Sequence, residues 1–171
     1  MSTIDTFTGK KIDPFNPDPD CIVIEDIAHA LGMLCRFGGH CTEFYSVAEH
    51  SVHVSNLVPI GFELWGLLHD ATEAYIGDVV RPIKHTSDMD AYRSAEARLN
   101  RAIAGKFGIP VIVPPEIKAV DTKMLAIEKS QILPGANIPP ILGDPSVNML
   151  RLLNPKEAEH FFLERFYELT S

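Results

Sequence analysis

Apolar residues recur at helical spacing along most of this chain. In the segment IEDIAHALGML they occupy positions 27, 28, 31 and 34, which places them on one face of a helix. No segment alternates apolar and polar residues over a length that predicts a strand, so the expected fold class is an all-α single helical bundle. The expected helices cover residues 24–34, 45–58, 61–77, 87–107 and 115–131, and a last helix begins at residue 155.

Local signals mark the ends of several of these helices. Ser46 is followed three residues later by Glu49, which is the pattern of a capping box. Gly77 is expected to end the third helix, because a glycine closes a last helical turn without strain. Asn154 ahead of Pro155 predicts an N-cap followed by a proline in the first turn of the last helix.

The remaining segments are expected to connect the helices. Three prolines within residues 1–20 disfavour regular structure, so this segment is predicted to be an irregular arm. Residues 35–44 contain a Gly-Gly pair and are predicted to form a loop, and residues 133–145 are rich in proline and glycine. Residues 1–171 are therefore expected to form one domain, in which residues 132–171 supply a connection and the last helix.

The composition excludes several classes of protein. The chain has 171 residues, of which 46% are apolar, and this is enough for a sizeable core. A formal net charge of −8 without a basic tract argues against binding of a nucleic-acid polymer. No apolar run approaches the ~20 residues of a membrane helix, and the first residues lack the apolar core of a signal peptide. We therefore expect a cytoplasmic protein without a membrane partner, whose three cysteines are free thiols.

Four potential metal ligands lie on three of the expected helices. His50 belongs to the second helix, His69 and Asp70 stand side by side in the third, and Asp121 belongs to the fifth. An adjacent His-Asp pair is costly to bury without partners, and side chains on facing helices commonly build a metal site inside a bundle. Two imidazoles and two carboxylates suit a divalent ion of intermediate hardness, such as Mn, Co, Fe or Zn.

Two further acidic residues are candidates for proton transfer. Glu73 follows Asp70 by three positions and His69 by four, so a continuous helix would place it beside the metal. Asp78 comes just past the expected end of the same helix. A carboxyl group in either place can act as a general acid or base or orient a water, although each one alone also fits a solvated helix end.

Cationic residues occur where an anionic substrate would need them. Arg36 opens the Gly-Gly loop and can bind a phosphate, while Phe37 beside it can stack on a planar ring and His40 lies further along the loop. Lys84 follows in the turn after the third helix, and Lys118 lies one turn before the ligand of the fifth. Each is individually typical of a surface charge or, for Phe37, of a core residue. Together with a metal and a neighbouring acid, they indicate phosphoester hydrolysis.

This ordered set resembles the signature of the HD-domain phosphohydrolase superfamily, which is a histidine, then a His-Asp pair, then a later aspartate. The segments SVAEHSVHVS, LLHDATEAYIGDVVRPIK and IKAVDTKMLAIE resemble those of the YfbR-like deoxyribonucleoside 5'-monophosphatases. The segments DIAHALGMLCRFGGH and FYSVAEHS resemble even more those of the phage DatZ group of dATP triphosphohydrolases. The resemblance covers roughly residues 12–130 and implies an all-α HD-domain bundle with metal ligands His50, His69, Asp70 and Asp121.

The resemblance also implies roles for the other candidates. Glu73 and Asp78 match the acid/base pair of the superfamily. Phe37 stands where the monophosphatase branch has a tryptophan. The positions that match phosphate-binding residues are Arg36, Lys84 and Lys118.

The expected function is hydrolysis of deoxynucleotides, in the first place a dATP triphosphohydrolase that releases deoxyadenosine and triphosphate. A 5'-nucleotidase for deoxynucleoside monophosphates is the second expectation, and a non-catalytic nucleotide- or metal-binding HD protein is the third. The expected cofactor is one tightly bound divalent ion, Zn, Co, Mn or Mg, with additional ions arriving with the substrate. The expected partners are a small-molecule nucleotide and further copies of the chain in a dimer or hexamer, and a protein of phage origin would act in the host cytoplasm.

Overall fold

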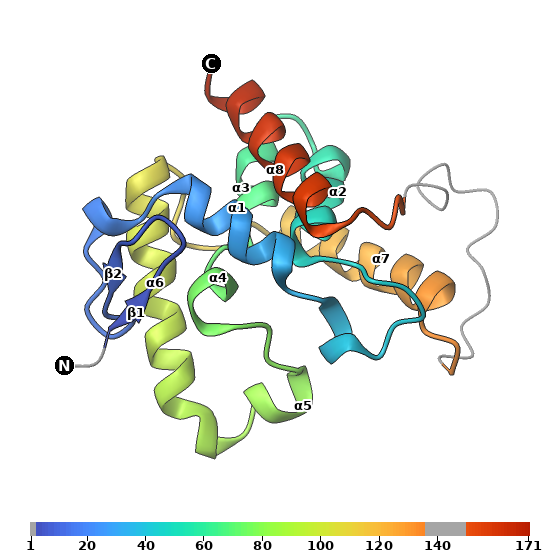
Figure 1. Cartoon of the computed structure of the whole chain (residues 1–171), viewed down its shortest axis with the longest axis horizontal. Helices are drawn as coiled ribbons and strands as arrows, with labels where there is room; N and C mark the ends of the chain where they lie inside the picture. The colour runs from blue at the N-terminus through green and yellow to red at the C-terminus, as the bar shows by residue number, and fades with distance from the viewer. Residues whose placement is uncertain (1–2, 136–149) are drawn as a thin grey trace.

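The computed structural model describes residues 3–135 and 150–171, and in these residues it is predominantly helical, which confirms the all-α prediction (Figure 1). Most of the predicted connection over residues 133–145 lies outside the described residues. No helix in the described part is long and apolar enough to cross a membrane. The longer helices are α1 (Ile24–Met33), α2 (Val47–Leu57), α6 (Asp90–Phe107), α7 (Pro115–Ile132) and α8 (Pro155–Thr170). The shorter elements are α3 (Glu63–Leu68), α4 (Glu73–Ile76), α5 (Arg81–Lys84) and the 3-10 turns η1 (Pro19–Cys21), η2 (Arg36–Gly39) and η3 (Ser87–Met89).

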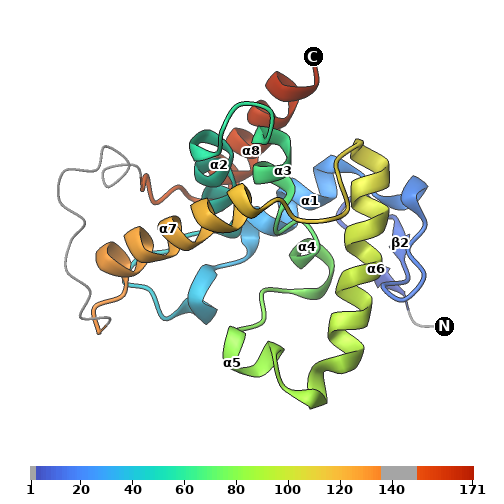
Figure 2. The same cartoon turned by 180° about the vertical axis from the view of Figure 1, so that it is seen from behind.

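Helix α2 lies at the centre of the packing. It contacts α1, α3, α7 and α8, and Figures 1 and 2 show α8 lying across α1, α2 and α3. Val47 of α2 belongs to the larger apolar cluster, and Val54 belongs to a smaller cluster shared with α7. A helix with neighbours on several sides must also bury polar residues, and each of these groups then needs a partner. The buried polar residues of α2 are Glu49, His50, Ser51, His53 and Ser55.

The contact between α2 and α3 depends on a glycine. A Cβ atom added to Gly66 would lie 3.0 Å from Cα of Ser55 and 3.1 Å from a methyl carbon of Val58. The missing side chain therefore lets the backbones of α2 and α3 approach closely. His69 follows α3 directly, so this approach also brings His69 toward α2.

The prediction of one continuous third helix over residues 61–77 is wrong, because the segment forms two short helices. The segment forms α3, then turns over residues 69–72, and then α4, which ends at Gly77 with a φ of 78°. Amide groups in the break bond three residues back, from Ala71 to Leu68 and from Glu73 to Asp70, which tightens the backbone beyond α-helical geometry. His69 and Asp70 thus lie in a turn and not in the middle of a helix.

The predicted irregular arm is also wrong in part. Strand β1 (Ile4–Asp5) pairs with β2 (Lys11–Ile12) in a small antiparallel hairpin. The prolines follow this hairpin, so they leave its amides free to pair. The hairpin is fastened to α1 by Thr8, whose amide and hydroxyl donate to the carboxylate of Asp26 at 2.7 and 2.9 Å.

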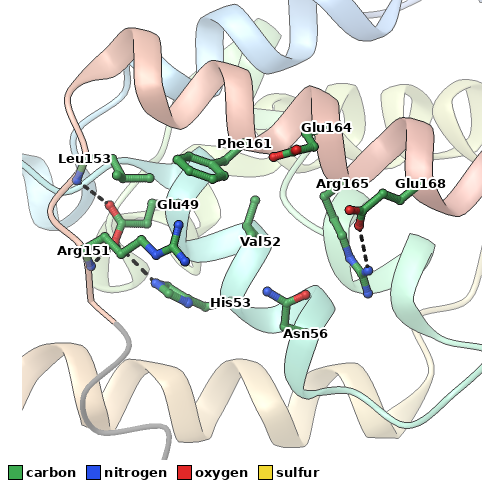
Figure 3. A pocket seen from close by; sticks show the side chains of 10 residues that line it. All are labelled: Glu49, Val52, His53, Asn56, Arg151, Leu153, Phe161, Glu164, Arg165 and Glu168. Carbon is green, nitrogen blue, oxygen red and sulfur yellow. Dashed lines mark hydrogen bonds and ion pairs between the residues drawn. The ribbon is translucent and has the colours of Figure 1, made fainter.

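The capping box predicted at Ser46 is half formed. The Ser46 hydroxyl accepts from the amide of Glu49 at 3.0 Å, as expected. The Glu49 carboxylate turns instead toward residues 151–153 and accepts from their three backbone amides at 2.6–3.1 Å, beside His53 (Figure 3). Glu49 thereby ties the segment that enters α8 to α2, at one wall of a cavity of about 480 Å³.

We expect Gly66→Ala to destabilise the protein by about 1–3 kcal/mol, because the added methyl group would press on the backbone of α2. Thermal unfolding followed by circular dichroism measures the change. The matched control is Gly105→Ala in α6, where an added Cβ meets nothing within 4 Å. That substitution should raise stability by roughly 0.5–1 kcal/mol, since alanine replaces glycine inside a helix. Equal effects of the two substitutions would contradict the close approach of α2 and α3.

Candidate metal centre and adjoining cavity

Side chains from three separate segments converge on one point. Nε2 of His50 on α2 lies 3.2 Å from Nε2 of His69 in the turn after α3, and 3.3 Å from Oδ1 of Asp121 on α7. Potential ligand atoms of these three residues all lie within 4.8 Å of one another, so the group can hold a metal ion. Oδ2 of Asp70 lies 3.2 Å from Nε2 of His69 and 3.7 Å from Nε2 of His50. The four predicted ligands are therefore neighbours in space.

Hydrogen bonds fix the orientation of both imidazole rings. Nδ1 of His50 lies 2.5 Å from Oε1 of Glu128, and Nδ1 of His69 lies 2.7 Å from the carbonyl oxygen of Gly66. An ionised carboxylate and a carbonyl oxygen can only accept, so each Nδ1 carries the proton. Burial would lower the pKa of His50, but Glu128 and Asp121 raise it to about 9, so a bound ion would displace a proton from Nε2 of this ring. In the neutral form of each ring the lone pair is on Nε2, which faces the other histidine. Metal-binding histidines are commonly held in this way by a partner on the second ring nitrogen.

The spacing of these atoms fits a metal ion. Metal–nitrogen distances of about 2.0–2.1 Å set two ligand atoms of a tetrahedral site roughly 3.3 Å apart. The 3.2 Å between the two Nε2 atoms and the 3.3 Å from His50 to Asp121 agree with this value. Two facing imidazole lone pairs with carboxylate oxygens beside them form a donor set that suits a divalent ion.

Glu128 on α7 is the residue of this site that the sequence analysis missed. Its fully buried carboxylate contacts His50 through Oε1, accepts from the Tyr45 hydroxyl at 2.9 Å, and pairs with Arg36 at 3.1 Å. One signal was available: Glu128 follows Asp121 by seven positions, which is two turns along the same face of a helix. A glutamate among the apolar residues of an otherwise buried face indicates a specific partner.

The charges around the cluster keep its carboxylates ionised. Burial alone would raise the pKa of Asp70, but the histidines and Arg36 hold it well below its usual range. Burial would also raise the pKa of Asp121, but the contact with His50 lowers it. The pKa of Glu128 is likewise lowered, because His50 and Arg36 outweigh its burial.

A cavity of about 470 Å³ opens beside the cluster, and most of the predicted site residues line it. Helix α7 contributes Asp121 and, one and two turns later, Leu125 and Lys129. Lys118 is exposed and does not belong to this lining, since it lies nearer the start of α7; Lys129 provides the cation there instead. The predicted residues that do line the cavity are Arg36, Phe37, His40, Asp70, Glu73, Asp78, Lys84 and Asp121.

Glu73 is the chemically unusual residue of this cavity. Its side chain is 8% exposed, and Oε2 has no hydrogen-bond partner in residues 3–135 and 150–171. Burial raises the pKa of Glu73 well above its ordinary value, and the negative charges of Asp70 and Asp78 raise it further. Burial also raises the pKa of Asp78. The pKa values of Glu73 and Asp78 are thus raised, whereas that of Asp70 is lowered, and carboxyl groups with opposite shifts are suited to different roles in proton transfer.

Two cations at the cavity are held by acidic neighbours. Arg81 pairs with Oδ2 of Asp121 at 3.3 Å, and Lys84 pairs with Glu96 on α6. Both cations belong to α5, which was not predicted as a helix. Arg93 of α6 also donates to the carbonyl oxygen of Lys84, so α5 is anchored to α6 at this end.

The fold and the site define an all-α protein with a histidine and aspartate cluster able to hold a metal ion. No family model matches the chain. It is 40% identical over 174 residues to the uncharacterized protein YfdR of Escherichia coli (strain K12), which covers 99% of this chain and 97% of YfdR. It is 35% identical over 182 residues to the uncharacterized protein RCAP_rcc00048 of Rhodobacter capsulatus, covering 95% and 92% of the two chains. The chain belongs to the family of these proteins.

We expect the purified protein to bind a divalent ion. We expect His69→Ala to weaken this binding by more than about 100-fold, because removing a direct ligand costs more affinity than removing a residue that only orients a ligand. Equilibrium dialysis with Zn, Co and Mn followed by elemental analysis measures the affinity. His85→Ala is the control, because His85 is an exposed histidine outside the cluster. Equal metal binding by the two variants would show that the cluster is not the metal centre.

We expect Glu128→Gln to lower metal affinity by about 10–100-fold, because a neutral amide no longer fixes the charge and the proton position of His50. Glu116→Gln tests the same chemical change at the start of α7 and should leave the affinity unchanged. Circular dichroism of both variants shows whether the helices are intact, so that a loss of affinity in a folded variant can be assigned to the disturbed His50 ring. An unaltered affinity in Glu128→Gln would refute the orienting role of Glu128.

Proposed function

We propose that this protein is a divalent-metal-dependent hydrolase of deoxynucleoside phosphates, with a dNTP, and dATP in particular, as the first substrate to test. The observation that supports the proposal is the composition of one cavity. Its walls carry Asp70 and Asp121 of the ligand cluster, the buried Glu73 carboxyl group and cations from three segments of the chain. The resemblance to the HD-domain superfamily supports the same reaction class.

The ligand cluster adjoins this cavity through Asp70 and Asp121. His50, His69, Asp70 and Asp121 would hold the ion, which would be Zn, Co, Mn or Mg. When bound, such an ion supplies Lewis-acid polarisation of a phosphoryl oxygen and activation of water. The ionised state of Asp70 and Asp121 prepares the site for a cation.

Glu73 would supply the proton that the reaction needs. Cleavage between the 5' oxygen and phosphorus leaves an alkoxide, which must be protonated as it departs. A carboxyl group with a raised pKa keeps its proton to higher pH than an ordinary glutamate and can donate it to that oxygen. Asp78 lies on the same cavity wall and would accept or relay a proton in the same reaction.

The cations of the cavity would bind the phosphate chain. Arg36 is held by Glu128 at 3.1 Å and lies 3.6 Å from Asp70, so its guanidinium group is fixed beside the cluster. A fixed guanidinium can bind a phosphate oxygen pair and stabilise charge in the transition state. His40, Lys84 and Lys129 extend the cationic lining, and such a set favours a substrate with several phosphates over one with a single phosphate.

A deoxynucleoside 5'-monophosphatase is the second candidate. Arg81 and Lys84 are already paired with Asp121 and Glu96, so fewer cations stand ready for a long phosphate chain. Both reactions break the same bond and would use the same groups. Each dNTP and dNMP incubated with Mn, Co or Mg distinguishes them by chromatography of the products. Tripolyphosphate formed together with a deoxynucleoside supports the first candidate, and orthophosphate formed from a dNMP supports the second.

We expect Glu73→Gln to keep the metal and lose activity by ~100-fold or more, because the amide cannot donate the proton of a general acid. Asp70→Ala should lose both metal and activity. Glu43→Gln, in an exposed loop position, is the control for a changed carboxylate and should retain the wild-type rate. Unchanged turnover in Glu73→Gln would refute its catalytic role. Hydrolysis of no nucleotide by the metal-loaded wild-type protein would leave a non-catalytic binding function.

A further inference from the structure

Two cysteine side chains meet at the base of the loop that carries cavity residues. Sγ of Cys35 lies 3.4 Å from Sγ of Cys41, and both residues are partly exposed. A disulfide bond requires a sulfur separation of about 2.05 Å, so a small movement of the two side chains would allow the bond to form. The third cysteine, Cys21, lies in η1 and is a separate thiol.

The five residues between the two cysteines, which we name the cavity loop (residues 36–40), include three residues of the cavity lining: Arg36, Phe37 and His40. Both ends of this loop are held in place. Cys35 forms an isolated β-bridge with Ser46 at the start of α2. Past Cys41, the amide of Thr42 donates to the carbonyl oxygen of Ile132 at 2.9 Å.

The backbone of the cavity loop is conformationally costly. Phe37 and Gly38 have positive φ values of 57° and 59°, and a bulky side chain at such a φ is rare. The cysteines close the loop at the two sides of this turn. A covalent bond between them would therefore restrict the loop to conformations close to the one described.

We propose that Cys35 and Cys41 form a redox-modification site, in which a low-molecular-weight disulfide such as oxidised glutathione converts the two thiols into an intrachain disulfide that closes the cavity loop. Burial raises the pKa of the Cys41 thiol, and its hydrogen bond with Cys35 raises it further. Cys41 thus keeps its proton more firmly than an ordinary cysteine, and we assign it the second step of the exchange.

The exchange is balanced in two steps. The Cys35 thiolate attacks one sulfur of oxidised glutathione, which forms a mixed disulfide and releases one glutathione thiolate. The Cys41 thiolate then attacks Sγ of Cys35, which forms the intrachain bond and releases the second glutathione. Two electrons pass from the protein to glutathione, and the two thiol protons end on the released thiolates.

The consequence for ligand binding rests on the proposed function. Closure of the cavity loop holds Arg36, Phe37 and His40 in place before a phosphate compound arrives, so less conformational freedom is lost on binding. The oxidised protein should bind inorganic tripolyphosphate roughly 2–10-fold more tightly than the reduced protein.

The first experiment tests the disulfide without any substrate. Wild-type protein is incubated with oxidised glutathione, denatured, and its free thiols are titrated. We expect one free thiol of the original three, no glutathione adduct in the intact mass, and a peptide map that links Cys35 to Cys41. Cys21→Ser is the control and should form the same bond, whereas Cys35→Ser should not. A stable mixed disulfide, three remaining thiols or a bond to Cys21 would overturn the proposal.

The second experiment tests the coupling to the cavity. Hydrogen–deuterium exchange of peptides covering the cavity loop should slow on oxidation and recover with dithiothreitol. Calorimetric titration with tripolyphosphate should show the affinity change in wild type and Cys21→Ser but not in Cys35→Ser. Equal affinities in the two redox states would overturn the coupling. A protein that forms the disulfide but hydrolyses no nucleotide would count against the proposed function and leave the modification site standing.

Discussion

A fully buried carboxylate, that of Glu128, is the constraint on which the rest of the site depends. An ionised group without water must be matched by donors or cations, and Glu128 has three: His50, Arg36 and Tyr45. These partners come from α2 and from the loop directly before it, so one carboxylate joins α7 to residues 36–50, which are distant from it in sequence. The two oxygens of this carboxylate therefore set both the orientation of the His50 ring and the position of the Arg36 guanidinium group. A ligand at Arg36 and an ion at His50 would share this support.

The position of α2 explains how one helix serves two purposes. Glu49 and His50 are adjacent and point to different sides of the helix. His50 faces the cluster, whereas Glu49 holds the backbone that leads into α8. Because α2 is surrounded by α1, α3, α7 and α8, a side chain leaving it in either direction enters packed protein. Glu49, His50 and Ser55 are tied to defined partners, and the site rests on a rigid element of the fold.

Environment, and not residue type, separates the acidic residues of the cavity into two groups. Asp70 and Asp121 lie beside histidines, and Asp70 also beside Arg36, and these groups hold their pKa values below the usual range. Glu73 is buried without a hydrogen-bond partner for Oε2 in the described part of the chain, and its neighbours are themselves acidic, so its pKa is raised. The first two are suited to a cation and the third to holding a proton. This division is what the proposed chemistry requires of carboxyl groups that stand so close together.

The sequence by itself determined the helical class, most helix boundaries and the four residues of the cluster, because helical periodicity, caps and residue chemistry are local properties. It did not determine the break between α3 and α4, where bonds three residues back and the packing of Gly66 on α2 override the helical pattern. From the sequence, Lys118 was expected to bind the substrate, but Lys129 lines the cavity and Lys118 does not. Which end of α7 faces the cavity depends on how the other helices pack around it. The partners of Glu128 and the Cys35–Cys41 contact came only from the tertiary structure. Both depend on distances between side chains in the folded chain, and a sequence pattern carries no such distances.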